Sequence, residues 1–122
     1  MRTISENEIH LWVVRDEEIS DLQLLELYHG FLSKKESEQQ KRFYFEKHRH
    51  QYLVTRALVR SVLSMYSSQL QPHQWQFDKN AYGKPSIANP GYDHLKFNLS
   101  HTENMVVLAI ANSIELGVDV EW

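Results

Sequence analysis

The 122-residue sequence has no cysteine, only four glycines and three prolines, and no long apolar run. Without cysteine, neither a disulfide framework nor a thiolate metal site can form, which fits a reducing compartment. No segment is long and apolar enough to span a membrane, and the first ten residues lack the hydrophobic core of a signal peptide. We therefore expect a cytoplasmic protein that does not interact with membranes.

The composition is typical of an ordinary globular domain, with 42% hydrophobic and 24% charged residues. The length predicts a single domain over residues 1–122. The net charge is −3, but residues 34–60 hold eight basic and three acidic residues, a local charge of +5. This excess indicates either an anionic partner or a solvated helix face. Because the whole chain is acidic and has no known nucleic-acid-binding signature, we expect no nucleic-acid partner.

Hydrophobic spacing predicts the elements of the first half. Residues 8–15 alternate as in a strand, and residues 22–30 have helical spacing, with Ser20 or Asp21 as a cap and Gly30 as a stop. Ser33 and Glu36 have the spacing of a capping box.

A long helix is predicted from about Glu46 to Ser67, because four apolar residues form a stripe along one side: Val54, Leu58, Val62 and Met65. Arg49, Arg56 and Arg60 fall on a second stripe, which we expect to present a row of guanidinium groups to a groove.

The second half indicates strands and one ordered loop. Residues 73–78 read as a short strand, and residues 79–94 as a loop with turns at Gly83 and Pro90-Gly91. Residues 95–101, 104–111 and 114–121 are expected to form an antiparallel meander. The predicted fold class is therefore α+β, a small antiparallel sheet packed against the long helix.

Two carboxylates close the sequence, in G-V-D-V-E-W. Asp119 and Glu121 alternate with two valines, so in a strand they share one face about 6.5–7 Å apart. Carboxylates in that arrangement suit a hard cation such as Mg²⁺ that keeps waters or phosphates as further ligands. The alternative is a strand that merely exposes two acids to solvent.

Two further motifs contain groups suited to anions. In F-N-L-S-H-T, Ser100 and His101 end a predicted strand, where a hydroxyl, an imidazole and turn N–H groups form a plausible anion pocket. In Y-G-K-P, Gly83 permits a close backbone approach beside Lys84. Taken alone, a histidine such as His101 is more often a surface or packing residue than a ligand.

Five motifs, in order, resemble a known family. R-F-Y-F, L-V-R-S-V-L, Y-G-K-P, F-N-L-S-H and G-V-D-V-E, from Lys41 to Glu121, resemble the first half of the 4'-phosphopantetheinyl transferases of the surfactin-synthetase-activating type. These enzymes transfer the 4'-phosphopantetheine arm of coenzyme A to a serine of an acyl or peptidyl carrier protein, with Mg²⁺ on the pyrophosphate.

The resemblance also implies roles for particular residues. Asp119 and Glu121 would be the Mg²⁺ ligands. The nucleotide site would be formed by Tyr82, Gly83, Lys84, Asn98, Leu99, Ser100 and His101, with Ser100 and His101 near the 3'-phosphate. Glu36 and Gln39 stand where some members have basic residues that contact coenzyme A, and Lys35, Lys41 or Arg56 would replace those contacts.

Full-length members of that family consist of two similar halves, and the second half contains a W-x-x-K-E motif. No such motif occurs in this sequence. The resemblance therefore implies an N-terminal half of the pseudo-two-fold fold, with the C-terminal half absent, inactive alone and able to form a homodimer. The alternative is a non-catalytic module that binds nucleotides or anions.

Overall fold

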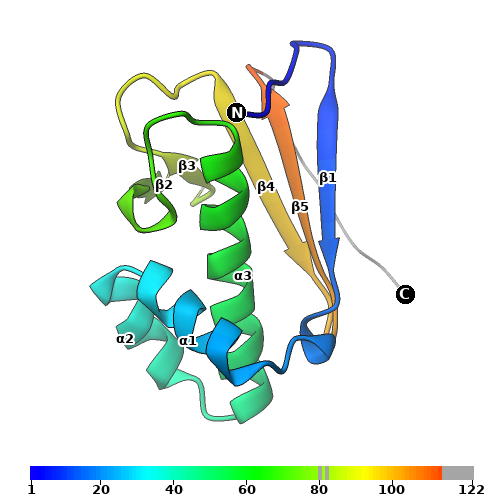
Figure 1. Ribbon diagram of the computed structural model, residues 1–122, viewed down its shortest axis with the longest axis vertical. Coiled ribbons are helices and arrows are strands. Elements are labelled where there is room, and N and C mark those ends of the chain that lie inside the picture. Colours follow the sequence, from blue (N-terminus) through cyan, green and yellow to red (C-terminus); the bar gives the residue numbers. More distant parts are fainter. Residues whose placement is uncertain (80, 82, 114–122) are drawn as a thin grey trace.

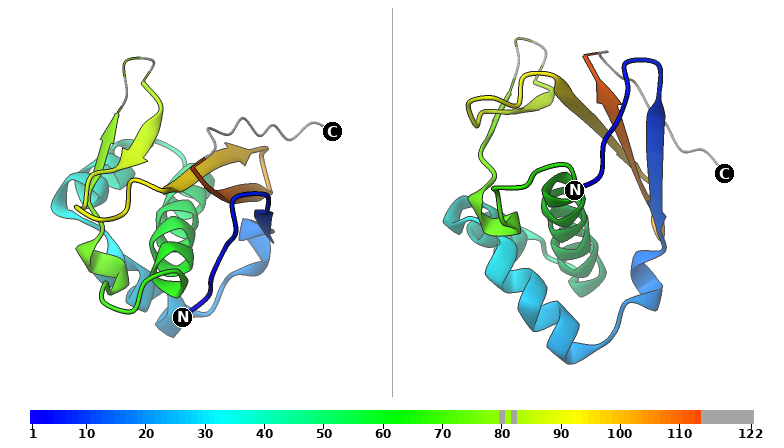
Figure 2. Two further views of the ribbon diagram at one scale, coloured as in Figure 1. Left: turned by 90° about the horizontal axis from the view of Figure 1, so that it is seen from above. Right: turned by 45° about the horizontal axis from the view of Figure 1, so that its top comes forward.

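The computed structural model describes residues 1–79, 81 and 83–113 and has the predicted α+β fold. A three-stranded antiparallel sheet of β1 (Ile9–Val14), β5 (Val106–Asn112) and β4 (Leu95–His101) covers one side of the long helix α3 (Glu46–Met65). The shorter helices α1 (Leu22–Phe31) and α2 (Lys34–Arg42) lie against other parts of α3, as Figures 1 and 2 show. Short 3₁₀ turns, η1 (Asp16–Glu18) and η2 (Pro72–Gln74), complete the helical elements.

Side chains at the helix starts confirm the predicted caps. The Asp21 carboxylate accepts hydrogen bonds from the backbone N–H groups of Gln23 and Leu24 at the start of α1. Ser33 and Glu36 form the expected capping box at the start of α2. Gly30 does not end α1, which continues through Phe31. These caps matter because both helices are short and isolated short helices are marginal in water.

The core lies between α3 and the sheet. Seven α3 residues are buried, namely Leu53, Val54, Ala57, Val59, Arg60, Val62 and Leu63. Val59, Val62 and Leu63 form one cluster with Phe97 of β4 and Ile110 of β5. Of the predicted apolar stripe, Met65 is largely exposed because it lies in the last turn of the helix. The predicted bounds of this helix are otherwise correct to within two residues.

The order of the sheet corrects the predicted meander. β4 and β5 pair antiparallel as expected, but the other side of β5 pairs with β1, from Ile9 with Ala111 to Val14 with Val106. The place beside β5 that the meander would give to residues 114–121 is therefore occupied by the N-terminal strand. The side chains of β5 are buried on both faces of the sheet, as expected of a central strand. Its backbone pairs with β4 along one edge and with β1 along the other. Residues 114–121 themselves lie outside the described residues.

A two-stranded hairpin corrects two further predictions. β2 (Phe77–Lys79) pairs antiparallel with β3 (Pro85–Ile87), so the expected loop contains a strand. Residues 72–74, which overlap the strand predicted over 73–78, form η2 instead. Pro72 begins this turn, and the side chains of Gln71 and Gln74 each accept a hydrogen bond from the backbone N–H of the other residue. Gly83 and Gly91 have φ values of +78° and +88°, so both predicted turns require glycine.

The two faces of the sheet differ in their surroundings. Trp12, Phe97 and Leu108 face α3, and the strand alternation places Ile9, Leu11 and Val13 on the opposite face. These three side chains are 55%, 60% and 58% exposed. An apolar row is therefore open to solvent on β1, which is an edge strand among the residues that the structure describes. Within the described part of the chain, no helix is long and apolar enough to cross a membrane.

Candidate nucleotide-binding site

Strand β4 contains four of the predicted site residues, and its alternation divides them between two faces. Asn98 and Ser100 pair with Ala109 and Val107 and lie on the sheet face away from α3. Leu99 lies on the α3 side and packs against the core. His101, the last residue of β4, is exposed on that same side. A ligand that contacts both Ser100 and His101 must therefore sit around the end of the strand.

The β2–β3 hairpin brings the glycine–lysine motif close to β4. Lys84 immediately precedes β3, and β3 lies against β4. The Phe77 ring of β2 packs edge-to-face on Phe97 of β4, with 5.6 Å between ring centroids. The hairpin that contains Gly83 and Lys84 thus packs beside β4, and their role in binding a nucleotide stays a prediction. Tyr82 lies outside the described residues.

Arg56 lies near this hairpin but already has a carboxylate partner. Its Nε donates to the Glu36 carboxylate at 2.7 Å, and its guanidinium lies over the Phe77 ring, 5.2 Å from the centroid. Arg60 contacts the same carboxylate at 2.8 Å and the same ring. Two guanidinium groups against one carboxylate leave one positive charge in excess beside the hairpin. Whether Arg56 contacts coenzyme A stays a prediction.

Glu36 is ionised by its surroundings despite being buried. Burial alone would raise the pKa of this carboxyl, but the hydrogen bond from the Ser33 backbone N–H and the charges of Arg56 and Arg60 outweigh it. The pKa of Glu36 is therefore lowered. Glu36, which stands where some family members have a basic residue that contacts coenzyme A, is thus the centre of an ion-pair network with Arg56 and Arg60.

The prediction that α3 presents a row of guanidinium groups to a groove is wrong. Arg60 is 2% exposed and donates to the backbone carbonyls of Pro72 and Trp75 as well as to Glu36. Arg49 donates to the carbonyls of Phe43 and Tyr44. Helical spacing put these arginines on one side of α3 correctly, but tertiary contacts occupy their N–H groups. They join helices and turns instead of lining an open groove.

The end of the sheet that follows His101 is fastened to the start of α3. The Gln51 side-chain nitrogen donates to the carbonyl oxygens of Thr102 and Glu103, at 2.7 and 3.0 Å, and contacts Asp16 at 3.2 Å. Lys47 pairs with Glu103 at 2.9 Å, and this pairing lowers the pKa of the Glu103 carboxyl. The turn after Ser100 and His101 is thereby held in one place.

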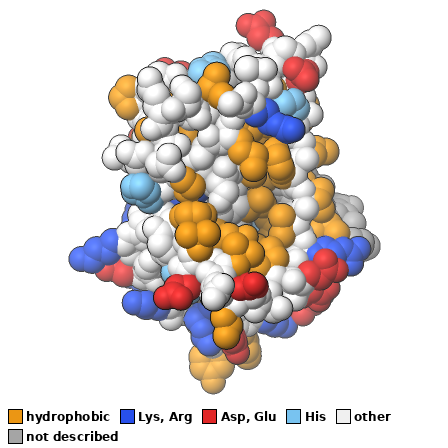
Figure 3. Space-filling model, in the orientation of Figure 1, with side chains coloured by type: hydrophobic (Ala, Val, Ile, Leu, Met, Phe, Trp, Pro, Cys, Tyr) orange, Lys and Arg blue, Asp and Glu red, His pale blue; other side chains and the backbone are white. Residues whose placement is uncertain are grey.

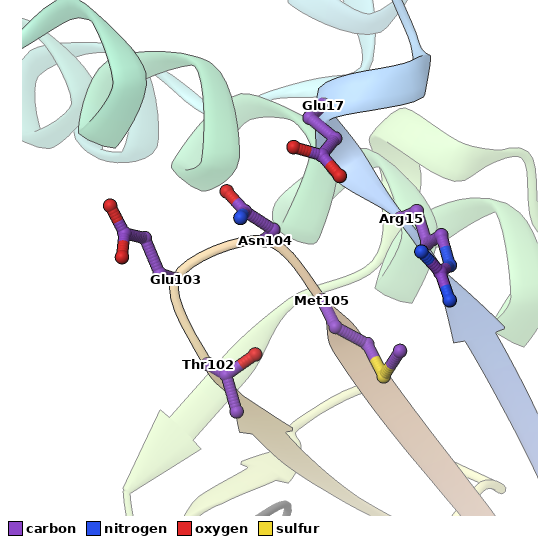
Figure 4. A pocket seen from close by; sticks show the side chains of 6 residues that line it. All are labelled: Arg15, Glu17, Thr102, Glu103, Asn104 and Met105. Carbon is purple, nitrogen blue, oxygen red and sulfur yellow. The ribbon is translucent and has the colours of Figure 1, made fainter. Parts of the chain in front are cut away.

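A hollow of about 300 Å³ lies beside this turn (Figure 4). Its wall is made by six residues: Arg15, Glu17, Thr102, Glu103, Asn104 and Met105. Two carboxylates and one guanidinium do not favour a polyphosphate, because an anion needs excess positive charge. The phosphate contacts of the predicted site would therefore lie on the β4 and hairpin side of the turn.

The predicted metal ligands fall outside the described residues. Asp119 and Glu121 belong to residues 114–122. Among the residues that the structure does describe, no three His, Asp or Glu side chains are grouped closely enough to hold a metal ion. A magnesium site at Asp119 and Glu121 stays a prediction.

Comparison with known proteins identifies the family. Residues 20–113 match the family model described as "4'-phosphopantetheinyl transferase, N-terminal". The chain belongs to the 4'-phosphopantetheinyl transferases. Its architecture is that of one half of the transferase fold, as the α+β elements above show.

Two curated relatives agree with this family. The 4'-phosphopantetheinyl transferase HetI of Nostoc sp. is 34% identical over 122 residues, which cover 98% of this chain and 50% of the relative. A phosphopantetheinyl transferase of Thraustochytrium sp. is 34% identical over 89 residues, or 73% of this chain and 31% of the relative. The chain thus spans half of one relative and about a third of the other.

Sequence reasoning missed two residues that organise this region. Glu36 was interpreted as a lost coenzyme A contact, although it pairs with arginines 20 and 24 positions away. Gln51 gave no signal, because a glutamine inside a long helix is ordinary. The capping-box spacing of Ser33 and Glu36 fixed where Glu36 lies, but not what it faces.

Proposed function

We propose that the chain forms the coenzyme A-binding half of a transferase that moves the 4'-phosphopantetheine arm to a serine of an acyl or peptidyl carrier protein. In that reaction the serine oxygen forms a bond to the phosphorus bearing the arm, and the phosphoanhydride bond breaks. 3',5'-ADP leaves with the bridging oxygen, and the hydroxyl proton is released. The surfactin-synthetase-activating type is part of the proposal, on the motifs from Lys41 to Glu121.

The observation that carries the proposal is that F-N-L-S-H forms most of β4, and that the hairpin containing Gly83 and Lys84 packs against this strand. A hydroxyl, an imidazole and an ammonium group supply donors and positive charge for phosphates. Such a site works by positioning and charge neutralisation, which is what phosphoryl transfer mostly requires. Asp119 and Glu121 are the proposed Mg²⁺ ligands, and Mg²⁺ would neutralise pyrophosphate charge.

A second candidate is a non-catalytic module that binds nucleotides or anions. The same strand and hairpin support it, because they supply donors and positive charge for any ligand that carries phosphates. Both candidates require coenzyme A or a similar anion at β4. They differ only in whether the bound arm is transferred.

The open row on β1 supports a further part of the proposal, a homodimer. Ile9, Leu11 and Val13 lie side by side on the exposed face of an edge strand, and such apolar surface favours association. A second copy would bring the same row, which gives a symmetric contact.

The site is tested by nuclear magnetic resonance of the isotopically labelled chain. Titrated coenzyme A is expected to shift the backbone amides of residues 98–101 and of Lys84. The amides of α1, which lies on another side of α3, serve as an internal control. Shifts confined to α1, or absent throughout at millimolar coenzyme A, would contradict the proposed site.

A further inference from the structure

The turn between α2 and α3, residues 43–45, carries two aromatic side chains in solvent; we name it the aromatic turn. Tyr44 is 88% exposed and Phe45 is 56% exposed. Their rings meet edge-to-face, with 5.1 Å between centroids. Single apolar residues are common on surfaces, but adjacent exposed aromatic residues are typical of binding surfaces, where they act as anchors.

The aromatic turn is held in a fixed shape. One guanidinium nitrogen of Arg49 donates to the carbonyl oxygens of Phe43 and Tyr44, both at 2.8 Å. The Gln40 side chain donates to the Arg49 carbonyl at 3.2 Å. The Phe43 ring is half-buried against Tyr52, with 5.4 Å between centroids. A turn that is already ordered loses little conformational entropy when a partner binds.

Positive charge predominates around the two rings. Lys41 and Arg42 precede the turn and Lys47 follows it, whereas Glu46 is the one acid between Lys41 and Lys47, and all four side chains are exposed. In the described part of the chain, neither Lys41 nor Arg42 has an ion-pair partner, and the Lys47–Glu103 pair lies in solvent, where such pairs are weak. Hydrophobic side chains project at the lower end of the molecule, with both basic and acidic side chains near them (Figure 3). This combination suits a partner with carboxylates around an apolar centre.

The aromatic turn lies close to the end of β4. Lys47, in the first turn of α3, reaches Glu103, and Gln51, one turn later, binds the same β4–β5 turn. That turn directly follows Ser100 and His101. A protein that covered Tyr44 and Phe45 would therefore extend over the end of the sheet at which coenzyme A is proposed to bind.

We propose that the aromatic turn docks the carrier protein. Tyr44 and Phe45 enter an apolar part of the carrier surface, and Lys41 and Arg42 face carboxylates around it. The inference rests on the proposed function, which supplies the carrier protein as the partner. An anionic membrane is the main competing occupant, because aromatic and basic residues together also suit a lipid interface.

The experiment measures the affinity of an apo carrier protein for the 122-residue chain by calorimetry. The variants are Tyr44→Ala/Phe45→Ala and Arg42→Glu, and the control is Met65→Ala, an exposed apolar residue at the other end of α3. Lys41 is left unchanged because it is a candidate coenzyme A contact. Each of the two variants is expected to weaken carrier binding about tenfold or more, the scale of an interface anchor. Arg42→Glu should also flatten the salt dependence. Met65→Ala should leave the affinity unchanged.

Coenzyme A binding by the same variants separates this inference from the proposed function. All variants should bind coenzyme A as the unmodified chain does. Carrier affinity within twofold of the unmodified chain in both Tyr44→Ala/Phe45→Ala and Arg42→Glu, or no carrier binding by the unmodified chain, would overturn the docking inference. Loss of coenzyme A binding alone would instead contradict the proposed function.

Vesicles of phosphatidylcholine and phosphatidylserine test the competing occupant. The docking inference predicts that Tyr44→Ala/Phe45→Ala changes carrier binding and not vesicle binding. A variant that loses vesicle binding while retaining carrier binding would assign the aromatic turn to a membrane surface.

Discussion

The Glu36 carboxylate accepts a hydrogen bond from Arg60 Nε at 2.8 Å, and both side chains are almost wholly out of solvent. The same carboxylate binds Arg56 at 2.7 Å and the Ser33 backbone at 2.9 Å. Arg60 continues the connection to the carbonyl of Trp75. One carboxylate thus joins the start of α2 to α3, and through Arg60 to the segment that leads into the β2–β3 hairpin.

Glu36→Gln is expected to lower the free energy of unfolding by about 3 kcal/mol, because it leaves a buried guanidinium without its counter-charge. Chemical denaturation measures this change. Glu38→Gln, an exposed acid on the same helix, is the control and should change stability by less than about 0.5 kcal/mol. Equal effects of the two substitutions would mean that the network does not stabilise the fold.

The unmodified chain and Glu36→Gln are expected to differ in how their free energy of unfolding depends on pH. The pKa of Glu36 is lowered in the folded state, whereas an unfolded glutamate has a pKa of about 4.3. The stabilisation from Glu36 is therefore present above about pH 4.3 and is lost as the pH falls through that value towards the folded-state pKa. Between about pH 5 and 3, the unmodified chain should lose stability more steeply than Glu36→Gln. Parallel curves would contradict the lowered pKa.

Metal binding is expected to depend on coenzyme A. If Asp119 and Glu121 hold Mg²⁺ with help from phosphates, Mg²⁺ should bind poorly alone and more tightly by a coupling of about 1–3 kcal/mol with the nucleotide present. Asp119→Ala should abolish the coupling, and Asp93→Ala, an exposed acid elsewhere, should preserve it. Calorimetry in both orders of addition measures it. Undiminished coupling in Asp119→Ala would place the metal elsewhere.

The isolated 122-residue chain is expected to lack transferase activity, since it has no counterpart of the W-x-x-K-E motif. Mass spectrometry of apo carrier protein incubated with coenzyme A and Mg²⁺ detects the added arm. Transfer at about 1 s⁻¹ or faster, an ordinary enzymatic rate, would refute this prediction.

Association through β1 is tested by sedimentation equilibrium at micromolar concentration. The chain is expected to be a dimer that buries at least about 1,000 Å². Leu11→Lys places a charge in the centre of the exposed row and should yield monomers, whereas Leu27→Lys, an exposed leucine on α1, should not. A single species near 14.5 kDa for the unmodified chain would refute the dimer.

Local patterns were sufficient to predict the α-helices and the residues that cap the starts of α1 and α2. The periodicity from Val54 to Val62 gave α3 almost to its ends, because an amphipathic helix repeats the same signal over many turns. The turn at Gly83 followed from glycine's access to positive φ. The α+β class followed from these elements.

Such local patterns do not predict which distant segments of the chain pair with each other. The apolar run of β5 indicated a strand buried on both faces but not that Val14 pairs with Val106 across the chain. Likewise, Arg60 has the spacing of a surface residue beside Arg56, and only its contact with Glu36 explains its burial. The sequence indicated Ser100 and His101 together, whereas strand geometry divides them between faces.

The most direct test of the coenzyme A site compares coenzyme A with its 3'-dephospho form by calorimetry. A charge-assisted contact to the 3'-phosphate is worth roughly 1.5–3 kcal/mol, about 10- to 150-fold in Kd. We predict that the unmodified chain prefers coenzyme A by that factor and that Ser100→Ala/His101→Ala loses the preference, while His94→Ala, a histidine outside the site, keeps it. Equal affinity of the unmodified chain for the two forms would contradict the assignment of Ser100 and His101 to the 3'-phosphate.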